Sequence, residues 1–396
     1  MDMSNIVEKQ RREIMKKIVV AIDSFKGSLS TFEAGKAIEE AAKEMYENAE
    51  VTISPIADGG EGTVEAIISA SNGEHVRTAV CNPLGEKIEA TYGFIPHTKT
   101  AIIEMSAAAG ITLIEESERN PMNTTTFGVG EMILDAISKG CRKFVIGIGG
   151  SATNDGGVGM LQALGFEFLD KNGKQVLLGA KGLKDIAVIK TENAVKELKE
   201  CYFCVACDVK NILCGKNGCS AVYGPQKGAT PEMIKNMDMW LEKYAQLTRK
   251  VIPTSDANIP GTGAAGGLGF AFVSYLDATL ESGIELVMKE TELESYIKDA
   301  DIVVTGEGRL DGQSYMGKAP VGVAKLAKKY NKPVIAFSGC VTEDAIACNE
   351  HGIDAFFPIV RKPCTLDEAM NIDNAYKNLK DTAYQVFRLI KIYENK

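Results

Sequence analysis

The chain has 396 residues, of which 45% are hydrophobic and 24% are charged, and it contains 39 glycines but only 12 prolines. This composition excludes collagen-like and mainly disordered proteins, and the length predicts two or three domains. The formal net charge of −9 argues against broad binding to nucleic acid or to an anionic membrane surface, while a local basic pocket for a small anion stays compatible with it.

The chain shows no signal for a membrane span or for export. Its longest apolar stretch, 264–276, is shorter than the ~18 residues that a span needs and carries three glycines. Residues 1–15 have no apolar core or cleavage site, and we expect them to be an N-terminal extension without chemistry. Ten cysteines without an export signal favour reduced thiols, so we expect a cytoplasmic protein.

The first elements in chain order are two strand–helix units. Residues 17–22 (KIVVAI) form the first predicted strand, and Ser30 with Glu33 is a capping-box signature that predicts a helix. Residues 51–57 predict the second strand, and a helix follows from about Glu61.

Similar elements continue along the chain. The middle predicts strands at 87–94, 100–105 and 143–148, with a helix at 128–138. Later come strands at 301–305, 333–337 and 355–360, a helix that starts near Pro320, and a last amphipathic helix from about Tyr376 to Ile390. Strands that alternate with helices indicate an α/β protein with parallel sheets.

Glycine-rich polar loops follow five of the predicted strands, where ligands bind in open parallel sheets. Their residue ranges are 23–28 (DSFKGS), 58–63 (DGGEGT), 149–157 (GGSATNDGG), 208–211 (DVKN) and 306–314 (GEGRLDGQS). Glycine lets backbone N–H groups approach a phosphate, and aspartate can hold Mg²⁺ or orient a hydroxyl. Phosphoryl transfer needs these parts and little else. The three histidines lie outside these loops, so a general base would be a carboxylate.

Three motifs allow other interpretations. Residues 147–152 (GIGGSA), with Asp170 about 20 residues onward, fit the loose dinucleotide fingerprint of an NAD-dependent hydroxy-acid dehydrogenase. Residues 312–319 resemble a Walker A loop but end in alanine. Residues 261–267 (GTGAAGG) follow a proline and are a candidate phosphate cradle. A kinase, a dehydrogenase and a non-catalytic nucleotide-binding regulator therefore compete.

Five cysteines between Cys201 and Cys219 have a spacing that suggests a metal or iron–sulfur site. Because residues 202–206 look like a strand, a spacing of three would place successive cysteines on opposite faces. We therefore expect structural thiols.

Eight sequence blocks, taken together, resemble the bacterial glycerate kinases of the glycerate 2-kinase type. The blocks are DSFKGS (23–28), ADGGEGT (57–63), NPLG (82–85), GIGGSATNDGG (147–157), DVKN (208–211), YGPQKGA (223–229), GTGAAGGLG (261–269) and TGEGRLDGQS (305–314). The resemblance extends from Met15 to about Ile392. The chain departs from the family pattern at Ile212, Cys214 and Cys219.

The resemblance implies ATP-dependent phosphorylation of D-glycerate to 2-phosphoglycerate, with Mg²⁺, by in-line transfer of the γ-phosphate in an interdomain cleft. It also implies a flavodoxin-like, doubly wound domain, 16–79 plus 285–396, with a second α/β domain, 80–284, inserted into it. We expect no nucleic-acid or membrane partner.

Residue chemistry within the matched blocks suggests a role for each candidate. Asp208 is the favoured carboxylate to orient the attacking hydroxyl, with Asp155 as its rival, and Lys26 is a further catalytic candidate that would hold phosphate. The candidates for glycerate are Ser151, Thr153, Asn154, Asn211 and Arg309. Those for ATP or its phosphates are Lys227, Gly261, Gly263, Gly266, Gly267, Glu307, Gln313 and Ser314. Asp58 and Asp311 are the candidates for Mg²⁺.

Overall fold

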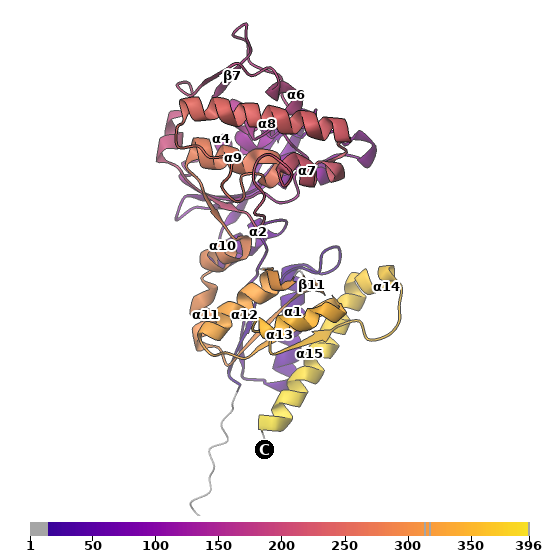
Figure 1. Ribbon diagram of the computed structural model, residues 1–396. Coiled ribbons are helices and arrows are strands. Elements are labelled where there is room, and N and C mark those ends of the chain that lie inside the picture. Colours follow the sequence, from indigo (N-terminus) through magenta and orange to yellow (C-terminus); the bar gives the residue numbers. More distant parts are fainter. Residues whose placement is uncertain (1–14, 313, 317, 395–396) are drawn as a thin grey trace, which may run out of the picture. The chain divides into compact units, whose positions relative to one another are not determined.

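The computed structural model describes residues 15–312, 314–316 and 318–394. The chain forms two compact units: a discontinuous unit, up to Ile56 and from Thr291 onward, and an inserted unit, Ala57–Glu290. Figure 1 shows the indigo start of the chain and its orange-to-yellow end together in the discontinuous unit. Met15, which the sequence analysis placed in an N-terminal extension, is buried in the core of this unit.

The discontinuous unit contains a five-stranded parallel sheet in the order β13-β12-β11-β1-β2. The strands are β1 (Lys17–Val20), β2 (Glu50–Ile53), β11 (Ile302–Leu310), β12 (Val334–Val341) and β13 (Ala355–Pro358). Numbered along this unit alone, the strand order is 2-1-3-4-5, which is the flavodoxin-like, doubly wound arrangement. The predicted α/β fold class is therefore confirmed.

Helices cover both faces of this sheet. Helix α1 (Thr31–Met45) packs against α15 (Ile372–Glu394). A second pair is formed by α11 (Leu293–Asp299) and α12 (Ala319–Lys329), which contact β1 and β11, respectively. Ser30 caps α1 through the predicted capping box with Glu33, which confirms that helix start. The remaining helices of this unit are the short η6 (Ser314–Met316), η7 (Glu343–Ile346), α13 (Ala347–Glu350) and α14 (Leu366–Met370).

The inserted unit contains a six-stranded mixed sheet in the order β10-β9-β6-β5-β4-β3. Strands β5 (Thr100–Glu104), β6 (Lys143–Gly147), β9 (Tyr202–Ala206) and β10 (Thr279–Glu281) run parallel to one another. Strand β4 (Lys87–Ile95) is antiparallel to both of its neighbours, β5 and β3 (Glu74–Cys81). A separate hairpin joins β7 (Glu167–Leu169) and β8 (Val188–Lys190).

Helices of the inserted unit enclose a second hydrophobic core. The longer helices are α2 (Thr63–Ser71), α4 (Phe127–Ser138), α8 (Pro231–Val251), α9 (Ala264–Leu276) and α10 (Gly283–Glu290). The shorter ones are α3 (Ser106–Ala109), η2 (Ile111–Leu113), η3 (Glu116–Glu118), α5 (Val158–Ala163), α6 (Ala180–Leu183), η4 (Lys196–Glu200), α7 (Cys219–Tyr223) and η5 (Pro225–Lys227). Tyr244 of α8 contacts Phe270 of α9 edge to face, with ring centroids 5.4 Å apart, so these two helices share the core.

The unit boundaries differ from those that the sequence analysis gave. They fall after Ile56 and after Glu290, not after residues 79 and 284. The physical reason is packing, because α2 contacts β4 and β5, and α10 contacts α2 and β9. The sequence pattern of a second strand–helix unit gave no sign that the helix packs on a different sheet from its strand.

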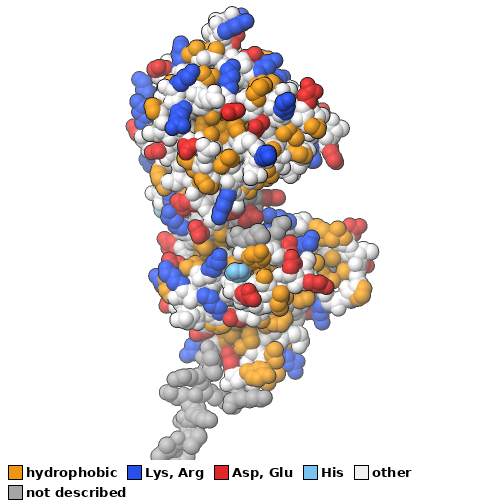
Figure 2. Space-filling model, in the orientation of Figure 1, with side chains coloured by type: hydrophobic (Ala, Val, Ile, Leu, Met, Phe, Trp, Pro, Cys, Tyr) orange, Lys and Arg blue, Asp and Glu red, His pale blue; other side chains and the backbone are white. Residues whose placement is uncertain are grey.

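The surface carries mixed charge, and no described helix is long and apolar enough to cross a membrane. On the face that Figure 2 shows, lysine and arginine side chains are interspersed with acidic ones over both units. The net charge of −9 is therefore not gathered into one acidic field on that face.

Candidate functional site

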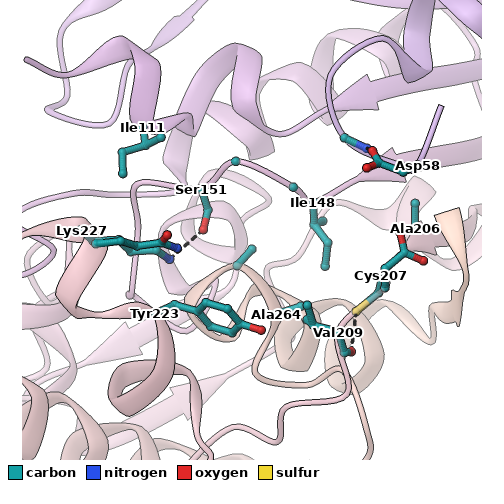
Figure 3. Close-up of a pocket in the computed structure, with 17 residues that line it drawn as sticks. Asp58, Ile111, Ile148, Ser151, Ala206, Cys207, Val209, Tyr223, Lys227 and Ala264 are labelled. Atoms are coloured by element: carbon teal, nitrogen blue, oxygen red, sulfur yellow. Dashed lines mark hydrogen bonds between the residues drawn. The ribbon is translucent and has the colours of Figure 1, made fainter. Parts of the chain in front are cut away.

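A pocket with a volume of about 400 Å³ lies entirely within the inserted unit. It forms at the carboxyl ends of the parallel strands β6 and β9, where the polar loops after these strands meet. The lining residues, most of them visible in Figure 3, are Asp58, Gly59, Gly60, Ile111, Ile148, Gly149, Gly150, Ser151, Ala206, Cys207, Asp208, Val209, Tyr223, Gln226, Lys227, Ala264 and Ala265. We call this the inserted-unit pocket.

Glycines bring the Asp58 loop close to the ends of β6 and β9. A Cβ on Gly147 would lie 2.5 Å from the carbonyl oxygen of Gly59, and a Cβ on Gly59 would lie 2.6 Å from the Cβ of Ala206. Gly59 also has a φ of +85°, which disfavours any other residue. The loop therefore approaches the sheet as closely as the backbone permits, and Asp58 becomes part of the pocket wall.

Lys227 and Ser151 form a hydrogen-bonded pair on this wall. The Lys227 Nζ donates to Ser151 Oγ over 2.7 Å and to the carbonyl oxygen of Thr153 over 2.6 Å. Figure 3 shows the two side chains directed toward each other. Lys227 is only 2% exposed, and burial lowers the pKa of its amine to about 8. No carboxylate of the described residues lies within ion-pair distance of this amine, so the pair is equipped to bind an anion.

Asp208 follows β9 and has two differently placed carboxylate oxygens. Its Oδ1 accepts a hydrogen bond from Ser282 Oγ at 3.1 Å and one from the backbone N–H of Gly283 at 3.0 Å. Within the part of the chain that the structure describes, Oδ2 has no hydrogen-bond donor. Burial raises the pKa of Asp208, and the carboxylate of Asp58 adds to the shift. Asp208 is exposed, and a pocket carboxylate with one oxygen left for a ligand is suited to general-base chemistry.

Asp58 faces the same pocket as Asp208, and its Oδ1 accepts from the backbone N–H of Gly60 at 3.2 Å. Carboxylate oxygens are the ligands that Mg²⁺ prefers, and Mg²⁺ is commonly held by one or two carboxylates together with substrate phosphates. The donor set therefore fits this ion. Among the described residues, no three His, Cys, Asp or Glu side chains form a ready metal cage.

Tyr223 is a pocket residue that the sequence analysis did not single out. Its phenol donates to Asn211 Oδ1 over 2.7 Å, and Asn211 Nδ2 donates to the carbonyl oxygen of Asn217 over 2.9 Å. Asn211 itself does not line the pocket, so it acts on the pocket through the Tyr223 ring. Tyr223 and Gln226 both belong to the YGPQKGA block, which was the available signal for them.

Asp155 and Asn154 are buried outside the pocket lining. Asp155 is 1% exposed and accepts hydrogen bonds from the backbone N–H groups of Thr126 at 2.8 Å, Gly157 at 3.1 Å and Gly159 at 3.3 Å. Burial raises its pKa. Asn154 donates to Ser220 Oγ over 2.8 Å. The geometry gives both side chains a role in holding the loop that carries Ser151, and it does not favour Asp155 as the base.

The glycine-rich segment 261–267 differs from the expected phosphate cradle. Ala264 and Ala265 line the pocket, whereas Gly261, Gly263, Gly266 and Gly267 do not. Gly266 has a φ of +65°, and a Cβ there would lie 2.1 Å from the carbonyl oxygen of Thr153. Gly263, Gly266 and Gly267 likewise leave room for neighbouring backbone, whereas Gly261 leaves room for the side chains of Leu280 and Cys207.

The second group of predicted site residues lies in the discontinuous unit. Its sheet has a topological switch point between β1 and β11, the place where such sheets bind ligands. Ser314 donates to Glu307 Oε1 over 2.6 Å, and Lys318 Nζ lies 4.0 Å from Glu307 and 3.7 Å from Asp311.

Other residues of this group lie close by in the same unit. Arg309 Nε lies 3.4 Å from Asp311 Oδ2. Lys26 is exposed on the loop after β1, and a Cβ on Gly308 would lie 3.5 Å from its backbone nitrogen. Gln313 lies outside the described residues. We call Lys26, Glu307, Arg309, Asp311, Ser314 and Lys318 the switch-point group.

Glu307 and Arg309 lie on a strand, not in a loop as the sequence analysis expected. Strand β11 continues to Leu310, paired with β12 as far as Val341. Glycines made this segment look like a loop. A Cβ on Gly308 would lie 3.3 Å from the Cα of Phe25, so the glycine permits the loop after β1 to approach β11 closely.

The dinucleotide fingerprint of a dehydrogenase does not form. After β6 the chain runs through ten residues before α5 begins at Val158, where the fingerprint requires a tight turn into a helix. Asp170 lies in a turn after β7, where its Oδ1 accepts the backbone N–H groups of Asn172 and Lys174. That strand belongs to the separate hairpin and not to the sheet of β6.

The clustered cysteines lie in different environments. Cys204 is buried in β9, whereas Cys207 lines the pocket and donates to the carbonyl oxygen of Val209 over 3.3 Å. Burial raises the pKa of both thiols to about 11. These thiols are therefore protonated at neutral pH.

Comparison with known proteins gives a consistent assignment. The model of the glycerate kinase family matches residues 18–391. A glycerate 2-kinase of Escherichia coli (strain K12) is 47% identical over 363 residues, which cover 92% of this chain and 95% of that protein. A glycerate kinase of Haemophilus influenzae is 45% identical over 374 residues, 94% of this chain and 98% of that protein.

A solved structure agrees with these sequence relatives. The crystal structure of a protein described as glycerate kinase 2 from Salmonella typhimurium LT2 matches with a TM-score of 0.89 and 44% identity, covering 96% of this chain and 100% of the other. The match extends over both units, and so does the family match. This chain is a kinase that belongs to the glycerate kinase family.

Proposed function

We propose that the enzyme transfers the γ-phosphate of ATP to the 2-hydroxyl of D-glycerate and forms 2-phosphoglycerate and ADP. The observation that carries the proposal is Asp208, which has one carboxylate oxygen anchored and the other without a donor among the described residues, in the same pocket as the Lys227–Ser151 pair. The relatives named glycerate kinase and glycerate 2-kinase support the choice of substrate and of hydroxyl.

In this proposal the pocket holds both functional groups of one small acid. From the sequence, Ser151 is a candidate to bind glycerate and Lys227 a candidate to bind phosphate. The two side chains are hydrogen-bonded to each other, however, and would bind the same anion. We assign them to the glycerate carboxylate. The 2-hydroxyl is on the neighbouring carbon, so one pocket wall would hold the carboxylate while Asp208 Oδ2 accepts the proton of the attacking hydroxyl. Tyr223 would form the adjoining wall.

We assign the phosphate and metal contacts to two sets of residues. Asp58 would hold Mg²⁺ on the inserted unit, and Asp311 would do so in the switch-point group. Bound Mg²⁺ would neutralise charge that develops on the transferred phosphoryl group. Lys26, Arg309 and Lys318 would supply positive charge for the phosphates of ATP, and Glu307 with Ser314 would hold Lys318 in place.

The proposal also includes a cytoplasmic location, which the ten free cysteines support. It is tested by incubating the protein with ATP, Mg²⁺ and D-glycerate, following ADP release in a coupled assay and identifying the product by phosphorus NMR. We expect glycerate-dependent ADP release and a 2-phosphoglycerate signal. A 3-phosphoglycerate signal would contradict the choice of hydroxyl, and ATP binding without turnover would contradict catalysis.

A further inference from the structure

Ser282 lies beside Asp208 because of the register of two parallel strands. Strand β10 pairs with β9 so that Glu281 stands opposite Ala206, and the backbone N–H of Cys207 donates to the carbonyl oxygen of Glu281 over 2.8 Å. Ser282, directly after β10, and Asp208, two residues after the end of β9, are consequently neighbours. Ser282 is half-buried, and α10 begins directly after it at Gly283.

The two donors of this segment bind the same oxygen of Asp208. Ser282 Oγ donates to Oδ1 over 3.1 Å, and the Gly283 backbone N–H donates to Oδ1 over 3.0 Å. Two bonds to one oxygen restrict the rotation of the carboxylate, and they leave Oδ2 for a ligand. A base that is held by a third group in this way is a recurring arrangement in enzymes that activate a hydroxyl.

The same two donors also favour the ionised form of the Asp208 carboxyl group. Burial, Asp58 and Glu285 each disfavour the ionised form of Asp208, and the bonds from Gly283 and Ser282 oppose them. The Gly283 N–H also belongs to the first turn of α10, where the helix dipole favours a negative charge. The segment therefore favours the carboxylate in the charged form that a general base requires.

Only the Ser282 side chain can be changed without disturbing the backbone here. A Cβ on Gly283 would lie 2.1 Å from the carbonyl oxygen of Asp58, so a substitution at Gly283 would displace the Asp58 loop as well. Removing the Ser282 hydroxyl leaves the Gly283 bond intact. It isolates one of the two contacts that orient Asp208.

We propose that Ser282 is a positioning residue for phosphoryl transfer, which holds Asp208 through a hydrogen bond to Oδ1 so that Oδ2 is presented to the substrate hydroxyl. This inference rests on the proposed function, in which Asp208 accepts the hydroxyl proton. Ser282 makes no contact with substrate in this account. Its loss is expected to lower the rate of the chemical step and to leave glycerate binding unchanged.

The test compares Ser282→Ala, Ser282→Thr and the matched control Ser138→Ala by steady-state kinetics. Ser138 is in the same unit, outside the pocket, and its hydroxyl donates to the Asp135 carbonyl oxygen. We expect kcat of Ser282→Ala to fall roughly tenfold, as for the loss of one hydrogen bond to a charged group, with KM for glycerate within about twofold of the wild type. Ser282→Thr keeps a hydroxyl and should recover most of kcat, and the control should match the wild type.

The inference and the proposed function fail in different ways. An unchanged kcat in Ser282→Ala, together with an inactive Asp208→Asn, would overturn the inference and leave the proposed function in place. A threonine variant as impaired as the alanine variant, or a raised KM with unchanged kcat, would also overturn the positioning role. Full activity of Asp208→Asn would contradict the proposed base, and the inference with it.

Discussion

The Lys227 ammonium donates to the hydroxyl of Ser151 over 2.7 Å, in a pocket wall where the lysine is 2% exposed. A buried ammonium is costly unless hydrogen bonds and a negative charge compensate it. Two hydrogen bonds are provided by Ser151 and by the carbonyl oxygen of Thr153. The pair is therefore prepared for an anionic ligand, and the first prediction follows from its charge.

Glycerate binding should weaken above about pH 8. Burial lowers the Lys227 pKa to about 8, so the amine loses its proton, and its attraction for a carboxylate, as the pH rises through that value. KM for glycerate, measured from pH 6.5 to 9.5 at constant ionic strength, should rise on the alkaline side. Lys227→Met should show a high KM throughout and no alkaline rise. A KM in the wild type that is flat to pH 9.5 would contradict the assignment.

At acid pH, kcat should fall at a higher pH than it would if the general base were an aspartate with an unshifted pKa. Burial is the main cause that raises the Asp208 pKa, and protonation removes the base. A raised pKa means that Asp208 takes up its proton at a higher pH. As the pH is lowered, kcat should therefore begin to fall while the pH is still above about 3.9, the usual pKa of aspartate. A profile of kcat at saturating substrates tests this. Constant kcat down to pH 4, in protein shown by circular dichroism to remain folded, would exclude Asp208 as the base.

Gly266→Ala should be much more disruptive than Gly173→Ala. Both glycines have positive φ, +65° and +78°, so each substitution costs about 1–2 kcal/mol of backbone strain. A Cβ on Gly173 meets nothing within 4 Å, whereas one on Gly266 lies 2.1 Å from the Thr153 carbonyl oxygen that accepts from Lys227. Urea denaturation should show a larger decrease in the free energy of unfolding for Gly266→Ala than for Gly173→Ala. KM for glycerate should rise in Gly266→Ala alone. Equal decreases in the free energy of unfolding would mean that the close packing of Gly266 against Thr153 does not contribute to stability.

Asp155→Asn should lower stability more than it lowers the rate. The carboxylate accepts backbone N–H groups from Thr126, Gly157 and Gly159, and an amide replaces one acceptor oxygen by a donor. We expect a loss of about 2–4 kcal/mol in the free energy of unfolding, typical of a broken buried network. In the folded fraction, kcat should remain within about tenfold of the wild type, since Asp155 does not line the pocket. A stable variant without activity would restore Asp155 as a candidate base.

The sequence was sufficient for features that depend on local patterns. The capping box at Ser30 and Glu33 is such a pattern, and the predicted α1 begins there. The loops after β6 and β9 were recognised as ligand-binding because strand ends and polar residues can be identified locally, and they supply Ser151 and Asp208 to one pocket.

Features that depend on distant contacts were not predictable in the same way. Asp155 and Asp208 look alike in sequence, and the structure distinguishes them because Asp155 is buried against Thr126 whereas Asp208 lines the pocket. Gly266 was interpreted as a phosphate-binding glycine because its packing partner, Thr153, is more than a hundred residues away in the chain. Tyr223 was passed over because a lone aromatic residue carries no functional signal until Asn211 is seen to hold it.

The most direct test of the central claim is kcat of Asp208→Asn with ATP, Mg²⁺ and D-glycerate, measured beside Asp155→Asn. Asparagine keeps the size of the side chain but cannot accept the hydroxyl proton as a base. We predict that kcat falls by about 10²–10⁴-fold, the usual contribution of a general base, while the melting temperature stays close to that of the wild type. Near-wild-type kcat in a folded Asp208→Asn variant would contradict the account.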